Sequence, residues 1–89
     1  MPVISFTANL QRHVKCPTMN VEGQTVGEAL QQFFTSYPLA QGYILTEQGT
    51  LRPHMVIFVN GQPIQDRTHL TDALPHQAEI HVMQALSGG

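Results

Sequence analysis

Charged side chains are scarce in this sequence. Only 11% of its 89 residues are Asp, Glu, Lys or Arg, and ten glutamines partly fill the gap; an average soluble domain has about 25%. Four basic residues stand against six acidic ones, and the basic residues form no cluster. Because nucleic-acid binding depends on neutralising phosphates, we expect no nucleic-acid partner. A surface with so little charge is poorly protected against protein contacts, which favours an interaction module.

Long apolar runs and paired cysteines are also missing. The longest apolar run, Met55–Val59, is far shorter than the roughly 20 residues of a membrane-spanning helix, so we expect no membrane contact. No basic segment followed by an apolar stretch stands at the N-terminus, so we expect no signal peptide. The single cysteine, Cys16, cannot form an internal disulfide, which fits a reducing compartment and a cytoplasmic protein.

The residue patterns of catalytic and metal sites are absent. No glycine-rich phosphate-binding loop is present, and nothing beside Cys16 would activate its thiol. Asp66 and Asp72 have no apolar surroundings that would tune a carboxyl group for acid–base chemistry, so we interpret them as turn and cap residues. The histidines lack the close spacing of metal ligands on one element; they are His13, His54, His69, His76 and His81. We therefore expect a protein that is not an enzyme and that binds no metal and no stable cofactor.

The first part of the chain predicts a β-hairpin. Residues 3–8 alternate loosely between apolar and polar side chains, as a strand does. Residues 13–16 form a second short run that can pair with the first, with residues 9–11 as the turn. Pro17 then ends the run, because proline cannot donate to a strand ladder.

One helix is clearly marked at residues 25–34. Thr25 and Glu28 form a capping box, in which two backbone N–H groups of the first turn find side-chain partners. Pro38 stops the helix, because the residue before proline is pushed out of the α region. The apolar residues fall on one stripe; they are Val26, Ala29, Leu30, Phe33 and Phe34.

The second half predicts a loop followed by strands. Residues 38–53 read as a long loop with one short strand or helical turn at most. Residues 54–59 form a β-rich strand, and Asn60-Gly61 is a strong hairpin signal because both residues tolerate positive φ. Residues 62–65 return as an edge strand.

Two further elements complete the pattern. Residues 70–74 read as a short turn or 3₁₀ piece, closed by Pro75. Residues 79–83 alternate between polar and apolar side chains and predict the last strand.

This order of elements predicts an α+β fold of the β-grasp (ubiquitin-like) type. It has a mixed sheet of four to five strands with one main helix on one face. The first and last strands lie side by side in the middle, covered by Leu30 and Phe33. We expect residues 1–84 to form the domain and residues 85–89 to form a flexible tail.

The tail ends on Ser87-Gly88-Gly89. It is either a frayed terminus or linker remnant, or a flexible arm whose terminal carboxylate reacts. Two residues without Cβ can thread a narrow channel in a partner enzyme. A carboxylate is inert until it is activated, so such an arm needs a separate ATP-using enzyme. Together with a β-grasp core, the second interpretation is favoured.

The chain resembles the MoaD/ThiS superfamily of small sulfur carrier proteins. The matching segments span nearly the whole chain; they are residues 25–30, 57–62, 79–83 and 87–89. The resemblance implies that an E1-like enzyme uses ATP to adenylate Gly89. A sulfur donor then converts it to a thiocarboxylate, while Gly88 gives the tail clearance. The acceptor would be an enzyme like cysteine synthase, the large subunit of molybdopterin synthase, or thiazole synthase.

Two features depart from the family pattern or refine it. Residues 74–77, Leu-Pro-His-Gln, replace an acidic turn before the last strand. The segment 38–53 makes the chain longer than the thiamine-type carriers and closer to the molybdopterin and cysteine-synthesis types, with a slight preference for the latter. A protein modifier conjugated through Gly89 and a plain interaction domain remain alternative functions.

Strand alternation predicts a docking face for the activating enzyme. The side chains expected to face the helix are Ile57, Val59, Ile80 and Val82. Phe58, His81 and Met83 then point to the opposite side. With Leu86, they would form the partner-binding face. The alternative assignment places Phe58 in the core with Val56.

Overall fold

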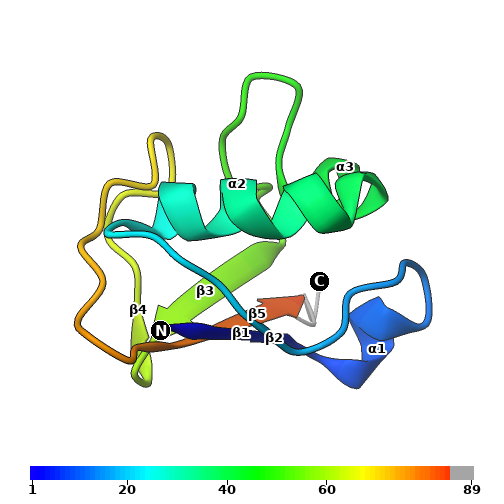
Figure 1. The fold of residues 1–89 in the computed structure, drawn as a ribbon. Helices are drawn as coiled ribbons and strands as arrows, with labels where there is room; N and C mark the ends of the chain where they lie inside the picture. The colour runs from blue at the N-terminus through cyan, green and yellow to red at the C-terminus, as the bar shows by residue number, and fades with distance from the viewer. Residues whose placement is uncertain (85–89) are drawn as a thin grey trace.

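A mixed five-stranded sheet forms the base of the molecule in the computed structural model, which describes residues 1–84 (Figure 1). The strands lie in the order β2-β1-β5-β3-β4. Their bounds are Val3–Phe6 (β1), Met19–Asn20 (β2), Met55–Val59 (β3), Gln62–Pro63 (β4) and Glu79–Gln84 (β5). β1 and β5 pair in parallel at the centre, whereas the other neighbours are antiparallel. With one main helix across one face, this is the predicted β-grasp arrangement.

The main helix, α2 (Val26–Ser36), forms where the sequence predicts it. Thr25 Oγ1 accepts a hydrogen bond from Glu28 N at 3.2 Å, which satisfies one of the unpaired N–H groups of the first turn. The Glu28 carboxylate accepts from Gln24 N at 2.8 Å, one residue before the position of an ideal capping box. The predicted apolar stripe is fully inside the molecule. Capping and periodicity therefore specify this helix locally.

The core lies between α2 and the sheet. Phe33 at its centre is fully buried, and its ring centroid lies 4.7 Å from that of Phe6 on β1. Ile4 and Val82 on the two central strands are also fully buried. The pairing of the first and last strands therefore places apolar side chains from both ends of the chain under one helix.

The predicted N-terminal hairpin is wrong. Residues 8–11 form a short helix, α1 (Ala8–Gln11), and the partner of β1 is β2, in which Asn20 pairs with Val3. The helical turn buries Leu10, which is only 2% exposed. The run 13–16 alternates like a strand because Val14 and Cys16 both pack against the core, but it is a connecting segment. A four-residue alternation is too short to separate these two cases.

The segment between α2 and β3 contains more regular structure than the predicted loop. A 3₁₀ turn, η1 (Pro38–Ala40), leads directly into α3 (Gln41–Ile44). Leu45 and Leu51 then form an isolated antiparallel bridge around the turn between them. Four small or apolar side chains anchor the segment in the core; they are Ala40, Ile44, Leu45 and Leu51. Burial of these side chains, rather than helix propensity, orders the segment.

The second hairpin is confirmed at its turn. Asn60 has φ 50° and Gly61 has φ 83°, the positive values that a type I′ turn requires. The return strand β4 has only the residues Gln62–Pro63, so it is shorter than predicted. Residues 70–74 do not form the predicted turn; Ala73 instead bridges to Thr25.

The turn in this region lies at residues 67–69 and is organised by Asp66. The Asp66 carboxylate accepts hydrogen bonds from the backbone N–H groups of Thr68 (3.1 Å) and His69 (2.8 Å), and from the Thr71 hydroxyl. The Thr71 hydroxyl and the other donors lower the pKa of Asp66 to about 2. Side-chain hydrogen bonds to the backbone therefore replace the predicted 3₁₀ geometry.

Candidate functional site

The sheet face opposite α2 carries a row of partly exposed apolar side chains. Phe58 on β3 pairs with His81 on β5, and Val56 pairs with Met83. All four are partly exposed, whereas Ile57 between Val56 and Phe58 is fully buried. The predicted orientation of Phe58, His81 and Met83 is therefore present, and the alternative with Phe58 and Val56 in the core is wrong. We call Val56, Phe58, His81 and Met83 the sheet face.

A hydrogen bond fixes the histidine on this face. The Oγ of Ser5 lies 2.9 Å from Nδ1 of His81, and the two residues are register partners on β1 and β5. The contact holds the imidazole ring against the two central strands, which leaves Phe58 and Met83 beside it. The sheet face thus combines three apolar side chains with one polar group that Ser5 holds in place.

The end of β5 is held by α1. Asn9 Nδ2 donates to Gln84 Oε1 at 3.2 Å, and α1, α3 and the end of β5 lie on the same side of the molecule (Figure 1). A depression beside Gln84 is lined by α1, α3 and the start of β3. The candidate residues Leu86, Gly88 and Gly89 lie outside the described residues.

Sequence reasoning did not single out the residues that surround this end of the sheet. Leu39 is 80% exposed and Tyr43 is 46% exposed, and both lie in the segment predicted as a loop. The signal available in the sequence is a long stretch without acidic side chains, because residues 29–46 contain neither Asp nor Glu. This stretch indicates a surface without negative charge only once the fold is known, because the fold places it beside α1.

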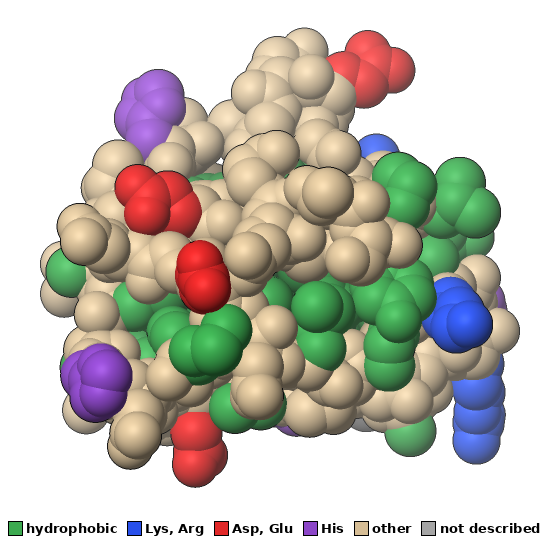
Figure 2. Space-filling view, in the orientation of Figure 1, with side chains coloured by type: hydrophobic (Ala, Val, Ile, Leu, Met, Phe, Trp, Pro, Cys, Tyr) green, Lys and Arg blue, Asp and Glu red, His purple; other side chains and the backbone are tan. Residues whose placement is uncertain are grey.

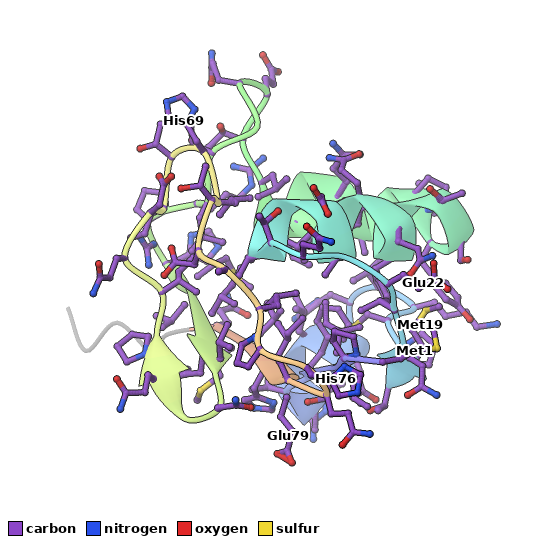
Figure 3. All side chains as sticks on the ribbon, turned by 60° about the vertical axis from the view of Figure 1, so that its left-hand side comes forward. Met1, Met19, Glu22, His69, His76 and Glu79 are labelled. Atoms are coloured by element: carbon purple, nitrogen blue, oxygen red, sulfur yellow. The ribbon has the colours of Figure 1, made fainter. Side chains whose placement is uncertain are left out.

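The chemistry-bearing side chains are spread over the described part of the chain. Within residues 1–84, no three His, Cys, Asp or Glu side chains converge in a way that could hold a metal ion. His69 and His76 lie well apart on separate loops (Figure 3). Cys16 is buried, and burial raises the pKa of its thiol above the ordinary value, which disfavours the reactive thiolate.

The length and composition of the helices bear on the prediction that the chain makes no membrane contact. None of the helices formed by residues 1–84 has both the length and the apolar character needed to span a bilayer.

The mixed sheet with one main helix across one face defines a protein of the ubiquitin-fold (β-grasp) class. Comparison with protein families makes this specific: the sequence profile of the ThiS family matches residues 5–89. The chain therefore belongs to the ThiS family. No curated protein sequence matches it significantly.

Solved structures agree with this fold over nearly the whole chain. The small archaeal modifier protein 1 (SAMP1) of Methanosarcina acetivorans is 25% identical, with a TM-score of 0.76, and the match covers 98% of this chain and 94% of that one. CysO of Amycolatopsis orientalis, solved in complex with BexX, is 17% identical with a TM-score of 0.81, and both chains are covered completely. CysO of Mycobacterium tuberculosis is also 17% identical, with a TM-score of 0.81 and coverage of 97% and 100%. This group of ubiquitin-fold proteins includes sulfur carriers and protein modifiers.

Proposed function

We propose that this chain is a sulfur carrier whose Gly89 becomes a thiocarboxylate. The observation that carries the proposal is the ThiS family match, which extends through the Ser87-Gly88-Gly89 segment to residue 89. Gly89 is the group that reacts, and Gly88 lets the backbone pass through a narrow channel because it has no Cβ. In this role the chain is a co-substrate of its partner enzymes rather than an enzyme.

The reaction has two steps. A carboxylate oxygen of Gly89 attacks the α-phosphorus of ATP, and pyrophosphate leaves. Sulfide (HS⁻) then attacks the acyl carbon, AMP leaves and the thiol proton is released, so that one oxygen of the carboxylate is replaced by sulfur. ATP and the groups that stabilise these steps belong to an E1-like activating enzyme, and the carrier itself needs no stable cofactor.

The sheet face is proposed to dock the activating enzyme together with Leu86. Phe58 and Met83 supply apolar contact area on a rigid sheet, and His81 adds a polar group held in place by Ser5. Interfaces of this kind concentrate their binding energy in a few partly buried aromatic and apolar anchors. β5 carries His81 and Met83 and ends at Gln84, directly before the tail, so one strand connects this docking surface to the tail.

The acceptor is proposed to be an enzyme like cysteine synthase. The high structural similarity to two CysO proteins, both with a TM-score of 0.81, and the long segment before β3 support this choice. Acceptors like the molybdopterin synthase large subunit or thiazole synthase are the other possibilities for the same chemistry. All of these reactions are proposed to occur in the cytoplasm.

Intact-mass spectrometry tests the proposal. The chain is incubated with its E1-like enzyme, ATP and sulfide. We expect a mass increase equal to the difference between one sulfur atom and one oxygen atom. A chain that ends at Gly88 should show no increase while it unfolds at the same temperature, because a terminal arm contributes little packing. Complete absence of both adenylate and mass increase in the full chain would overturn the proposal.

Protein modification is a second candidate, favoured by the 25% identity to SAMP1. In that case the activated Gly89 is attacked by a lysine amine of a target, and an isopeptide bond forms as AMP leaves. Conjugates of higher mass in cell extracts, lost when the chain ends at Gly88, would support this function. Their absence alongside thiocarboxylate formation would leave sulfur transfer as the function.

A further inference from the structure

Charges of opposite sign are separated on the face of the molecule that Figure 2 shows. The carboxylate side chains lie over the left-hand part and the upper loop in Figure 2, whereas Lys and Arg side chains border the apolar area on the right. The right-hand end is built by α1 with the residues that follow it, the end of α2, η1 and α3. Residues 8–15 and 33–44, which form this end, contain no Asp or Glu but include Arg12 and Lys15. One end of the molecule is therefore cationic although the chain has a net charge of −2.

Arg12 and Lys15 differ from the other two basic residues. Arg52 Nε donates to the carbonyl of Gly42 at 2.8 Å, and the Arg67 guanidinium donates to the carbonyl of Met55 at 2.6 Å. These two side chains help to hold the fold together. Arg12 and Lys15 are exposed, and within residues 1–84 the structure records no side-chain hydrogen bond for either of them. Their charges are available to a partner.

Large apolar side chains are exposed at the same end of the molecule. Leu39 and Tyr43 are two of the three large apolar side chains that are exposed in the described part of the chain. A depression next to Leu39 is lined by Val14, Lys15 and Tyr37, among others. An exposed leucine at the edge of an apolar depression, with the cation of Lys15 at its border, is typical of a protein-binding surface. We call Arg12, Lys15, Leu39 and Tyr43 the tail-end surface.

The position of this surface relative to Gly89 determines what must cover it. Gly89 lies five residues beyond Gln84, so it can reach at most about 17 Å from the end of β5. The longest dimension of the molecule is 35 Å. An enzyme that takes Gly89 into its active site must therefore approach the end of the molecule where β5 stops, where α1 contacts Gln84.

We propose that the tail-end surface binds the mouth of the channel through which the activating enzyme receives the tail. This inference rests on the proposed function and names a contact beyond the sheet face. By charge complementarity, the rim of that channel carries carboxylates opposite Arg12 and Lys15 and an apolar cavity that accepts Leu39. An end with only two exposed cations and an apolar depression suits a protein surface better than a nucleic acid, for which affinity grows with the number of phosphates neutralised.

The test is ATP–pyrophosphate exchange by the E1-like enzyme, measured as a function of carrier concentration. Lys15→Gln and Arg12→Gln should each raise the KM for the carrier about threefold, as expected for an exposed ion pair. Leu39→Ser should raise it about tenfold, because an apolar contact is lost. The kcat should stay unchanged, because these side chains do not touch the reacting atoms. Gln62→Glu on the remote strand β4 is the matched control: it changes the net charge by the same amount as Lys15→Gln and should leave KM unchanged.

Salt gives a second readout. The KM of the wild-type chain should rise with ionic strength, and it should rise less for Lys15→Gln, since screening acts on exposed charges. The substituted residues are exposed, so their thermal unfolding temperatures should equal that of the wild type.

Several results would overturn the inference. If the wild-type chain supports exchange and all three variants have the wild-type KM, this inference is refuted and the proposed function is not. If the wild-type chain supports no exchange, both the proposed function and this inference are refuted. If Lys15→Gln and Arg12→Gln keep the wild-type KM but no longer bind a single-stranded oligonucleotide that the wild-type chain binds, the two cations serve nucleic-acid binding instead, and the inference is refuted. A lower kcat at constant KM would place Lys15 beside the reacting adenylate and would equally refute the docking role.

Discussion

At the scale of single residues, one carboxylate organises the loop before the last strand. Asp66 accepts hydrogen bonds from Thr68, His69 and Thr71, and these donors hold its pKa at about 2. The sequence suggested a turn or cap role for Asp66, and the structure confirms that role. It did not predict where the turn lies, because the donors follow Asp66 at short range and could equally have formed a helical turn.

The lowered pKa of Asp66 predicts a specific acid sensitivity. Because the folded-state pKa of about 2 lies below the ordinary value of 3.8, the carboxylate contributes to stability above that value. The contribution is lost as the pH falls from there through 2. The urea midpoint of the wild type should therefore fall more steeply between pH 4 and 2 than that of Asp66→Asn, which should already be less stable at pH 7. Urea denaturation across this pH range measures both effects.

Glu47→Gln supplies the control for this experiment, because Glu47 is an exposed carboxylate in a different turn. It should retain the wild-type pH profile. Parallel profiles for the wild type and Asp66→Asn would contradict the assigned role of the carboxylate.

At the scale of elements, local signals decide how much can be predicted. α2 has a cap, an apolar stripe and a proline after its end, and β3 is followed by Asn60-Gly61; both were located correctly. α1 and α3 have no such signals and form because Leu10 and Ile44 are buried by the rest of the fold. Only the three-dimensional arrangement provides that burial. The sheet face was predictable because strand alternation is a local property, whereas the tail-end surface was not.

The entry into α2 offers a test of packing. Gly23 has φ 156°, and a Cβ at this position would lie 2.8 Å from the backbone nitrogen of Ala29. Gly23→Ala should lower the free energy of unfolding by about 1–3 kcal/mol, because a backbone atom must move. Urea denaturation gives the value.

Gly42 in α3 is the matched position for this test. Nothing lies within 4 Å of a Cβ built there, and alanine favours a helix. Gly42→Ala should therefore raise the free energy of unfolding by about 0.5–1 kcal/mol. If Gly23→Ala and Gly42→Ala change the free energy of unfolding by the same amount, the close contact at Gly23 does not affect stability, and the prediction is wrong.

At the scale of the whole molecule, the two faces of the sheet have different surroundings. α2 covers one face and completes the core, and the other face presents Phe58, His81 and Met83. The sheet face and the tail-end surface are linked by β5. This strand contributes His81 and Met83 to the sheet face, and it ends at Gln84, which contacts α1 beside the tail-end surface. In the proposed interaction, the activating enzyme engages both surfaces while it receives the tail.

The sheet face predicts a further kinetic phenotype. Phe58→Ser should raise the KM for the carrier in ATP–pyrophosphate exchange about tenfold, the size expected for an aromatic interface anchor, with unchanged kcat. Met19→Ser on the edge strand β2 also shortens a partly buried apolar side chain and should leave KM unchanged. Thermal unfolding of both variants identifies any loss of the folded state. Equal KM values for Phe58→Ser and the wild type would remove this face from the interface.

The central position of β5 has a mechanical consequence. β5 is hydrogen-bonded on both sides, in parallel to β1 and antiparallel to β3. Traction applied through its C-terminal end loads both ladders in shear, so that several hydrogen bonds resist together instead of opening one after another. A partner enzyme that pulls on the tail therefore meets the combined resistance of both ladders, and we expect the domain to stay folded under that force.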